Sequence, residues 1–484
     1  MNRMIFCSLG LILATQAVQA ADEPRTIEVV VRARAIEEPV LKYRLLPSEA
    51  QRKPGNAVPI LLRLPWEQTV WMNEVFPKLS ESAVRPLDSP EWKTTRDILP
   101  SNFVKEMERA AFRRDANWEY PLNETQSPYG ILLPDVQGLR GFLLYGLTAN
   151  IRYHLSRGEL ESARGAILIG LANSQHMAQT PFYVTQLVAA AIQRAMLDEV
   201  AEYIGQPQSP NLYWALSTLP ASLLEIDRAA DNEASLFTRT LPALDDLDRP
   251  RTPEEWRQMA DQLATLLREL GEMAPEQLEP NQPSVVSQIK KAVGLDDPSP
   301  LTMFVTAARP ELPQLLGLTA EQVAAMSDDE AAVRWYAARK IRMDERVGAT
   351  VVLSPREAWP QLVRLQHDIA SFQKQIGAES QRAAFFNPIS IYVATHAPQR
   401  KVAALRIIEA VRDYMNRHDG QLPASLDEID SVPIPLDPLT GEKFGWHVEG
   451  NTAVLAGSPL PAGVSAEDIP NSSAFVLEYR LRRE

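Results

Sequence analysis

The sequence predicts a mostly α-helical fold, made in part of helical hairpins, with a short N-terminal β region and a small C-terminal α+β module. After about residue 137, apolar residues recur three or four positions apart, which is typical of amphipathic helices. Proline is frequent, with 38 residues, and glycine is scarce, with 21 residues among 484. Prolines at helix starts and in linkers suit a chain of capped helices, whereas few glycines disfavour a β-sandwich with many tight turns.

Changes in these patterns divide the chain into five predicted segments. Residues 1–20 are a predicted signal peptide, residues 21–135 an extended or mixed region, and residues 136–245 a helical domain. Residues 246–395 form a second helical region with linkers, and residues 396–484 form a helix followed by a small antiparallel sheet.

The N-terminus has the organisation of a secretory signal peptide. Arg3 supplies a positive charge, and Met4 to Ala14 is mostly apolar but too short to span a bilayer. Val18 to Ala20 has the small-x-small pattern of a cleavage site, so we expect cleavage after Ala20, or after Ala21. The protein is therefore expected in the bacterial periplasm or outside the cell, without a transmembrane anchor; a retained anchor is the alternative.

The cysteine count and the net charge exclude several kinds of chemistry. Cys7 is the only cysteine and lies in the predicted leader, so a mature chain has no disulfide, no thiol nucleophile and no thiolate metal site. The formal net charge is −13, and an acidic protein gains no counterion-release energy from a phosphate backbone. Nucleic acid is therefore not an expected partner.

The N-terminal region is predicted to contain strands and a turn. Residues 26–35 and 39–47 are strand-like runs, and Lys53 to Pro59 is expected to be a turn. Ser89 to Trp92 is expected to start a helix. This region therefore differs from the helical middle of the chain.

A helical hairpin is predicted next, broken at Gly158 and resembling one tetratricopeptide-type unit with Ala163 and Gly170 at the crossing. Only one such copy is visible, so no repeat array is predicted. Thr180 and Pro181 are expected to start the following helix, and Ser209 and Pro210 the one after it.

Capping boxes mark further helix starts, at Thr252–Glu255, Thr319–Gln322, Ser327–Glu330 and Ser354–Glu357. The helix after Ser354 is predicted to run to about Gln375. One apolar stripe follows its length, formed by Trp359, Leu362, Leu365, Ile369 and Phe372.

The last long helix is predicted over residues 398–418, ended by Gly420. A short helix is expected after Ser425, and a turn over Asp437 to Gly441. Strands are expected at residues 444–448 and 452–455 and near the C-terminus. The last strand places alternate apolar residues on one face: Phe475, Leu477, Tyr479 and Leu481.

Two resemblances accompany these patterns. The blocks "KPGNAVP", "SPNLYWALSTLP" and "ALRIIEAVRDYMNRHDGQLPASLDEI" resemble an uncharacterised family of secreted proteins from planctomycete-type bacteria, and the resemblance implies no particular activity. The block from about residue 400 is similar to the helix-plus-small-sheet body of type II secretion pseudopilins, whose turn segment corresponds to Asp437 through Trp446. The chain lacks the prepilin leader and N-terminal helix of those proteins, so a shared fold element is implied, not a pilus subunit.

The pseudopilin resemblance implies a possible calcium site in the loop after the helix. Asp427, Asp430 and Asp437 are the candidate ligands, because calcium prefers carboxylate oxygens. Their spacing is not that of a helix–loop–helix calcium site. The alternative is structural: Asp427 as a first-turn charge and Asp437 as a turn former.

No catalytic motif is visible. The six histidines show no zinc-binding spacing, and the chain has no nucleophile elbow and no glycine-rich phosphate loop. Trp214, Trp335 and Trp359 are expected in the core, whereas Trp66 and Trp71 are the more exposed pair. Charged residues at Arg152, Arg164, Glu225 and Arg228 are expected to form ion pairs between helices.

These observations favour an exported helical scaffold that binds a protein or another envelope component, with no cofactor. One alternative is an exported hydrolase whose site is built from scattered carboxylates, since such chemistry needs only two carboxylates facing across a cleft. Another is a calcium-stabilised, pseudopilin-like component of an assembly. The sequence does not specify the oligomeric state.

Overall fold

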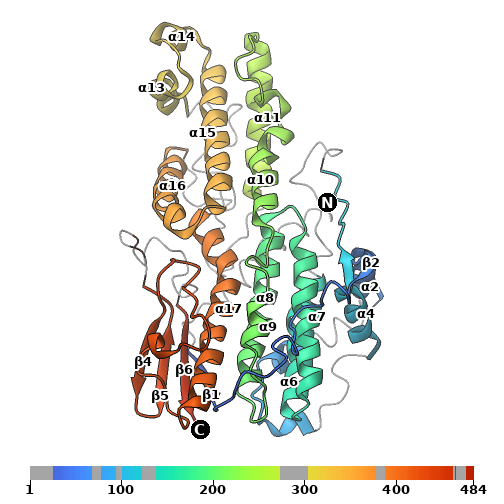
Figure 1. The fold of residues 1–484 in the computed structure, drawn as a ribbon. Helices are drawn as coiled ribbons and strands as arrows, with labels where there is room; N and C mark the ends of the chain where they lie inside the picture. Colours follow the sequence, from blue (N-terminus) through green and yellow to red (C-terminus); the bar gives the residue numbers. More distant parts are fainter. Residues whose placement is uncertain are drawn as a thin grey trace, which may run out of the picture. The chain divides into compact units, whose positions relative to one another are not determined.

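The structure, a computed structural model, describes residues 26–67, 78–93, 101–122, 138–272, 304–376, 387–459 and 476–484, together with residues 461 and 464. The predicted signal peptide lies outside the described residues. The fold is mostly α-helical with a small β region, as predicted (Figure 1). No helix in these ranges is both long and apolar enough to cross a bilayer.

The chain divides into two compact units. We call Asp227–Ile391, with Tyr120–Leu132 and Met1–Thr15, the helical unit. The sheet unit contains Gln16–Glu119, Leu133–Ile226 and Tyr392–Glu484. The five predicted segments stay a prediction.

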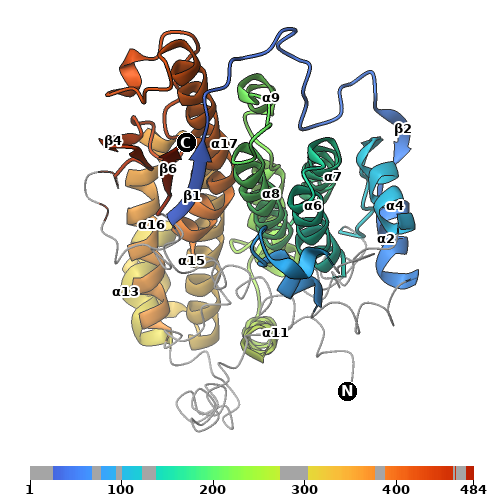
Figure 2. The same cartoon turned by 90° about the horizontal axis from the view of Figure 1, so that it is seen from below.

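The sheet unit contains a set of packed helices, which lie side by side in both views (Figures 1 and 2). Helix α6 (Leu147–Ser156) follows the π-helical turn η3 (Gly141–Gly146) and forms the predicted hairpin with α7 (Leu160–Ala178). Gly158 joins them with φ +72°, a conformation that favours glycine. Helix α8 (Tyr183–Ile204) packs on α7, and a Cβ added at Gly170 would overlap the Met196 side chain, so a larger residue there would force that side chain to move.

Two predicted helix starts are wrong by a few residues. Helix α8 begins at Tyr183 because the Thr180 hydroxyl donates to the Met177 carbonyl and so closes the end of α7. Helix α9 (Tyr213–Ser217) begins after Pro210, since the Ser209 hydroxyl donates back to the Ile204 carbonyl. In each case the expected cap completes the preceding helix.

The N-terminal part of this unit contains less strand than the sequence suggests. Residues 39–47 form no strand, and the expected turn at Lys53 instead includes a short strand, β2 (Lys53–Asn56). Strand β2 pairs with β3 (Arg113–Asp115), close to the helices α2 (Val58–Glu67) and α4 (Ser101–Ala111). Ser89 lies before η1 (Pro90–Lys93), a single 3-10 turn.

A four-stranded sheet brings the two ends of the described chain together (Figure 2). Its order is β1 (Thr26–Val31), β6 (Glu478–Arg483), β5 (Thr452–Ala456) and β4 (Gly445–Glu449). Strand β1 runs parallel to β6, whereas β4, β5 and β6 are antiparallel neighbours. One face is buried by residues of all four strands, including Val29, Leu481, Leu455 and the half-buried Trp446.

The helix α17 (Pro388–Arg417) packs its apolar residues into the same core as this sheet. It starts ten residues before the predicted start near Pro398, which lies inside it. Buried Ile391, Tyr392 and Val393 extend the helix backwards, so packing overrides the preference of proline for a first turn. After it, Ser425 caps η7 (Leu426–Glu428), and Gly441 takes φ +78° in the predicted turn.

The helical unit consists of amphipathic helices with local caps. Its elements are α10 (Ile226–Thr240), η4 (Pro242–Leu244), α11 (Pro253–Glu272), α13 (Val305–Leu316), α14 (Ala320–Ala325), α15 (Asp328–Val351) and α16 (Pro355–Gln375). The capping boxes at Thr252 and Thr319 are confirmed, and Ser327 accepts from the Glu330 N–H. Ser354 makes no side-chain cap, because its hydroxyl donates to the Glu357 carboxylate instead of accepting from the backbone.

An aromatic cluster forms the centre of this unit. Tyr336 and Trp335 of α15 contact Phe372 of α16, with ring centroids 5.5 and 5.3 Å apart. Trp335 and Trp359 are buried, as predicted, whereas Trp214 of the sheet unit is half-buried. The side chains of Trp66 and Trp71 lie outside the described residues.

Candidate functional site

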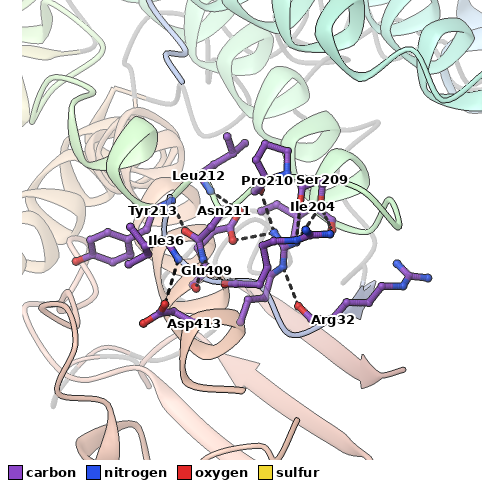
Figure 3. Close-up of polar contacts among 12 residues, drawn as sticks. Arg32, Ile36, Ile204, Ser209, Pro210, Asn211, Leu212, Tyr213, Glu409 and Asp413 are labelled. Carbon is purple, nitrogen blue, oxygen red and sulfur yellow. Dashed lines mark hydrogen bonds and ion pairs between the residues drawn. The ribbon is translucent and has the colours of Figure 1, made fainter. Parts of the chain in front are cut away.

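A buried polar cluster of the sheet unit surrounds Arg412 of α17. Figure 3 shows residues that form it, among them Glu409, Ser209 and Asn211. The Arg412 guanidinium is bonded to Glu409 one turn earlier, at 2.8 Å. Its Nη2 donates to both the carbonyl and the hydroxyl of Ser209, each at 2.9 Å. Nε and Nη1 donate to the carbonyls of Arg32 and Pro210, at 3.2 and 3.3 Å. We call Arg412, Glu409, Ser209, Asn211 and these backbone groups the Arg412 clasp.

Glu409 and Asn211 satisfy the other side of the clasp. The second Glu409 oxygen accepts from the Leu212 N–H at 3.0 Å, just before α9 starts. The Asn211 amide donates to the Glu409 carbonyl at 2.9 Å, and its oxygen accepts from the Tyr213 N–H at 3.0 Å. The "SPNLYW" block therefore serves to attach the chain between α8 and α9 to α17.

The N-terminal segment after β1 is attached to the same place. The Arg34 N–H donates to the Arg412 carbonyl at 3.0 Å, and the Asn211 amide donates to the Arg34 carbonyl at 3.2 Å. The Ile36 N–H donates to the Asp413 carboxylate at 3.1 Å. Three stretches that lie about 170 to 380 positions apart in the chain thus share one set of hydrogen bonds.

The clasp is fully enclosed. The side chains of Arg412 and Glu409 are 1% and 0% exposed. Burial raises the pKa of Glu409, and the positive charge of Arg412 opposes that rise. Because each of the five guanidinium N–H groups has an acceptor, this pair meets the condition under which a buried ion pair is tolerated.

A second buried ion pair joins α17 to the Asp437 turn. Arg400 donates through Nε and Nη2 to one oxygen of Asp437, both at 2.8 Å. The Ser458 N–H and hydroxyl each donate to that oxygen at 3.0 Å, and the Leu439 N–H donates to the other at 3.0 Å. The guanidinium lies against Gly457, where any side chain would collide with it. Asp437 is therefore a structural link as well as a turn former.

The structure does not bring the three predicted calcium ligands together. Asp437 is buried against Arg400, whereas exposed Asp427 pairs with Lys443 at 2.7 Å. Asp430 is exposed. Among the described residues, no group of three or more His, Cys, Asp or Glu side chains has the arrangement of a metal site.

A third buried pair links α6 and α8, and it confirms the interhelical ion pair expected at Arg152. Arg152 bonds Glu199 at 2.8 Å, Glu202 at 3.0 Å and the Arg85 carbonyl at 2.9 Å. Burial raises the pKa of Glu199 to about 8, although Arg152 favours its charged form. Arg164 instead pairs with Glu161 on its own helix.

One histidine is deeply buried. His176 of α7 is 1% exposed, and its Nε2 donates to the Ala110 carbonyl at the end of α4 at 3.1 Å. Burial, with a smaller contribution from the positive charge of the nearby Arg52, lowers the pKa of His176 to about 4. Its Nδ1 is buried without a hydrogen-bond partner. The ring therefore acts as a neutral donor that holds α4 against α7.

No family model, curated protein or solved structure was found to match the chain, so the two resemblances remain predictions. The Arg412 clasp was not predicted from the sequence. A signal was present, since Glu409 and Arg412 directly follow Ile408 and Val411, two residues of the predicted apolar stripe. Such charges inside an apolar stripe indicate a buried pair, but the partners outside the helix leave no local pattern.

Proposed function

We propose that the protein is an exported helical scaffold that binds a protein or another component of the cell envelope. The observation that supports this function is the Arg412 clasp, in which a buried charge pair joins the N-terminal segment, the α8–α9 connection and α17. The other buried pairs of the sheet unit act in the same way, between α6 and α8 and between α17 and the Asp437 turn. The buried charges of this unit thus hold remote segments in a fixed arrangement.

A fixed arrangement is what a scaffold needs. Binding of a partner costs less conformational entropy when the binding surface is ordered before the partner arrives. Buried charges that are fully bonded add specificity of packing more than net stability, because their desolvation offsets much of their attraction. This use of charge suits a protein whose role depends on shape.

The test is chemical cross-linking in the native cell envelope, followed by capture of the tagged full-length protein. We expect a stoichiometric partner, and the same complex when the partner carries the tag. Arg412→Met, which opens the clasp, should lose the partner, whereas Asn416→Ala should retain it, because Asn416 is exposed and lies outside the clasp. Capture is repeated with calcium and with a chelator, because a scaffold should retain its partner in both, whereas a calcium-dependent assembly should lose it in chelator.

The contrary outcomes are distinct. If no partner is captured under either condition while the purified protein turns over an envelope polymer, the scaffold function is wrong and the hydrolase alternative replaces it. Loss of the partner on chelation alone indicates a calcium-dependent assembly.

A further inference from the structure

The strand β4 is the last strand on one side of the sheet, and no labelled element lies beyond it within the sheet unit (Figure 1). The backbone bonds show which of its groups face outward. The Asn451 carbonyl, next to the first residue of β5, accepts from the Arg483 N–H at 2.9 Å. Since directions alternate along a strand, Thr452, Val454 and Ala456 bond toward β4. Their partners are Glu449, His447 and Gly445.

Trp446 and Val448 therefore direct their N–H and C=O groups away from the sheet. No hydrogen bond is made to these four groups within the part of the chain that the structure describes. Natural proteins usually protect such an edge with proline, lysine or a bulge. The segment Gly445–Glu449 contains neither residue type, and its ladder with β5 is regular.

The opposite side of the same sheet shows how an edge of this kind is occupied. There β1, from the far end of the chain, adds to β6 through a regular ladder and buries Val29 and Val31. The sheet thus accepts a strand that is remote in sequence when alternate apolar side chains accompany the backbone bonds.

From this edge we propose that two copies of the protein pair through β4, antiparallel and about a twofold axis at His447. In this register Trp446 of each copy lies opposite Val448 of the other copy. The outward N–H and C=O groups of Trp446 and Val448 in the two copies, eight groups in all, then form four hydrogen bonds between the strands. The two sheets become one continuous sheet of both copies.

The side chains are compatible with this register. Trp446 and Val448 are half-buried on the inner face, so each apolar residue meets an apolar residue across the axis. On the outer face Glu449 lies opposite Gly445, and no carboxylate lies opposite another. His447, which pairs with Glu449 at 3.1 Å, lies opposite its own copy. The strand is thus complementary to itself.

The pairing is expected to be weak and concentration-dependent. A five-residue edge is small compared with the roughly 1,200–2,000 Å² that stable interfaces bury. A covalent probe at the axis is therefore more sensitive than the oligomeric state alone. This pairing does not depend on the proposed function, because strand β4 shares no residue with the Arg412 clasp.

The test uses the full-length chain with Cys7→Ser, which leaves no native cysteine. At a pair without hydrogen bonds across antiparallel strands the Cα atoms lie about 4.5 Å apart, within the range that a disulfide bridges. His447→Cys should therefore form a disulfide-linked dimer under mild oxidation. The matched control is Lys443→Cys, an exposed site outside the strand. The dimer should form on the order of tenfold more slowly from the control.

A second pair of variants tests the backbone bonds. Val448→Pro removes an N–H that faces only the free edge, so the β5 ladder is kept, and the His447→Cys dimer should disappear. Val448→Ala trims the same side chain but keeps the N–H, and the dimer should persist. As a check that needs no substitution, amide exchange at Trp446 and Val448 should slow as protein concentration rises.

Equal dimer formation from the two cysteine sites, a dimer unaffected by Val448→Pro, or exchange independent of concentration each overturns the self-pairing. Slow exchange that appears only with another protein present also overturns it, since the edge then takes a segment of that protein.

Discussion

The sheet unit and the helical unit use their buried polar groups in different ways. In the sheet unit, buried charges connect segments hundreds of positions apart, as when Arg412 donates to the Arg32 carbonyl. In the helical unit, the shortest buried ion pair is local: Lys340 and Asp344 lie one helical turn apart at 2.6 Å. Its helices start with local caps and meet at the aromatic cluster of Trp335, Tyr336 and Phe372.

This difference has a thermodynamic consequence. A bond between remote segments must offset the entropy of closing a long loop, so it forms only with the rest of the unit. A local pair or cap stabilises its own helix and depends little on other elements. The sheet unit should therefore unfold in one cooperative step when a clasp is broken, whereas local changes in the helical unit should have small, confined effects.

The largest effect is expected from Arg412→Ala. Removing the arginine leaves Glu409 buried and unpaired, so the free energy of unfolding of the sheet unit should fall by about 3–5 kcal/mol. Denaturant unfolding measures the loss of free energy. Amide hydrogen exchange, compared between the sheet unit and the helical unit, shows in which unit the loss occurs. Asn416→Ala, at an exposed site on the same helix, is the control. A loss shared equally by both units would contradict the comparison.

A smaller loss is expected from Asp437→Asn, which keeps the shape of the turn but removes the charge that Arg400 and Ser458 bond. The unfolding free energy should fall by about 3 kcal/mol. Melting curves in calcium and in chelator should coincide for the native protein, because Arg400 occupies the Asp437 carboxylate. A lower melting temperature in chelator would restore the calcium prediction.

Acid should destabilise the sheet unit through His176. Its pKa is lowered from 6.5 to about 4 by burial, so the unfolded state binds the proton more tightly. The contribution of neutral His176 to the free energy of unfolding is fully present above pH 6.5 and is lost as the pH falls toward 4. The total loss is on the order of 3 kcal/mol. Stability measured against pH checks this, because His176→Gln should remove the part of the fall that lies between pH 6.5 and 4. A fall that His176→Gln leaves unchanged would contradict it.

The smallest effect is expected from Thr252→Ala in the helical unit. The Thr252 hydroxyl accepts from the Glu255 N–H at the start of α11, so its loss should cost about 1 kcal/mol. Thr265→Ala, at an exposed position of the same helix, is the matched control. Hydrogen exchange should change in α11 and not in the sheet unit; a change in both would remove the distinction between local and remote stabilisation.

Sequence reasoning succeeded where the physics is local. The helix after Ser354 ends near Gln375 as predicted, and its apolar stripe is buried, because spacing along one helix determines which side chains share a face. The hairpin broken at Gly158 and the turn closed by Gly441 follow from positive φ angles that glycine adopts most readily. These features need only a few consecutive residues.

The same reasoning failed where one residue has two candidate roles. Thr180 and Ser209 carry the side chains of helix caps, yet each hydroxyl completes the helix before it. Pro398 resembles a helix start but lies within α17, because buried residues before it continue the helix. The sequence predicts that Asp437 forms a turn or binds calcium, but it does not predict the bond to Arg400, 37 positions away.

The sequence by itself determined the mostly helical composition, the main helix starts and the turns around positive-φ glycines, because these depend on interactions within one or two turns of chain. Only the tertiary structure decided that β1 pairs with β6 across 452 positions and that Arg412, Ser209 and Arg32 meet. The physical reason is that such contacts depend on the packing of the whole unit, which fixes the partners that a buried charge or a strand edge can reach.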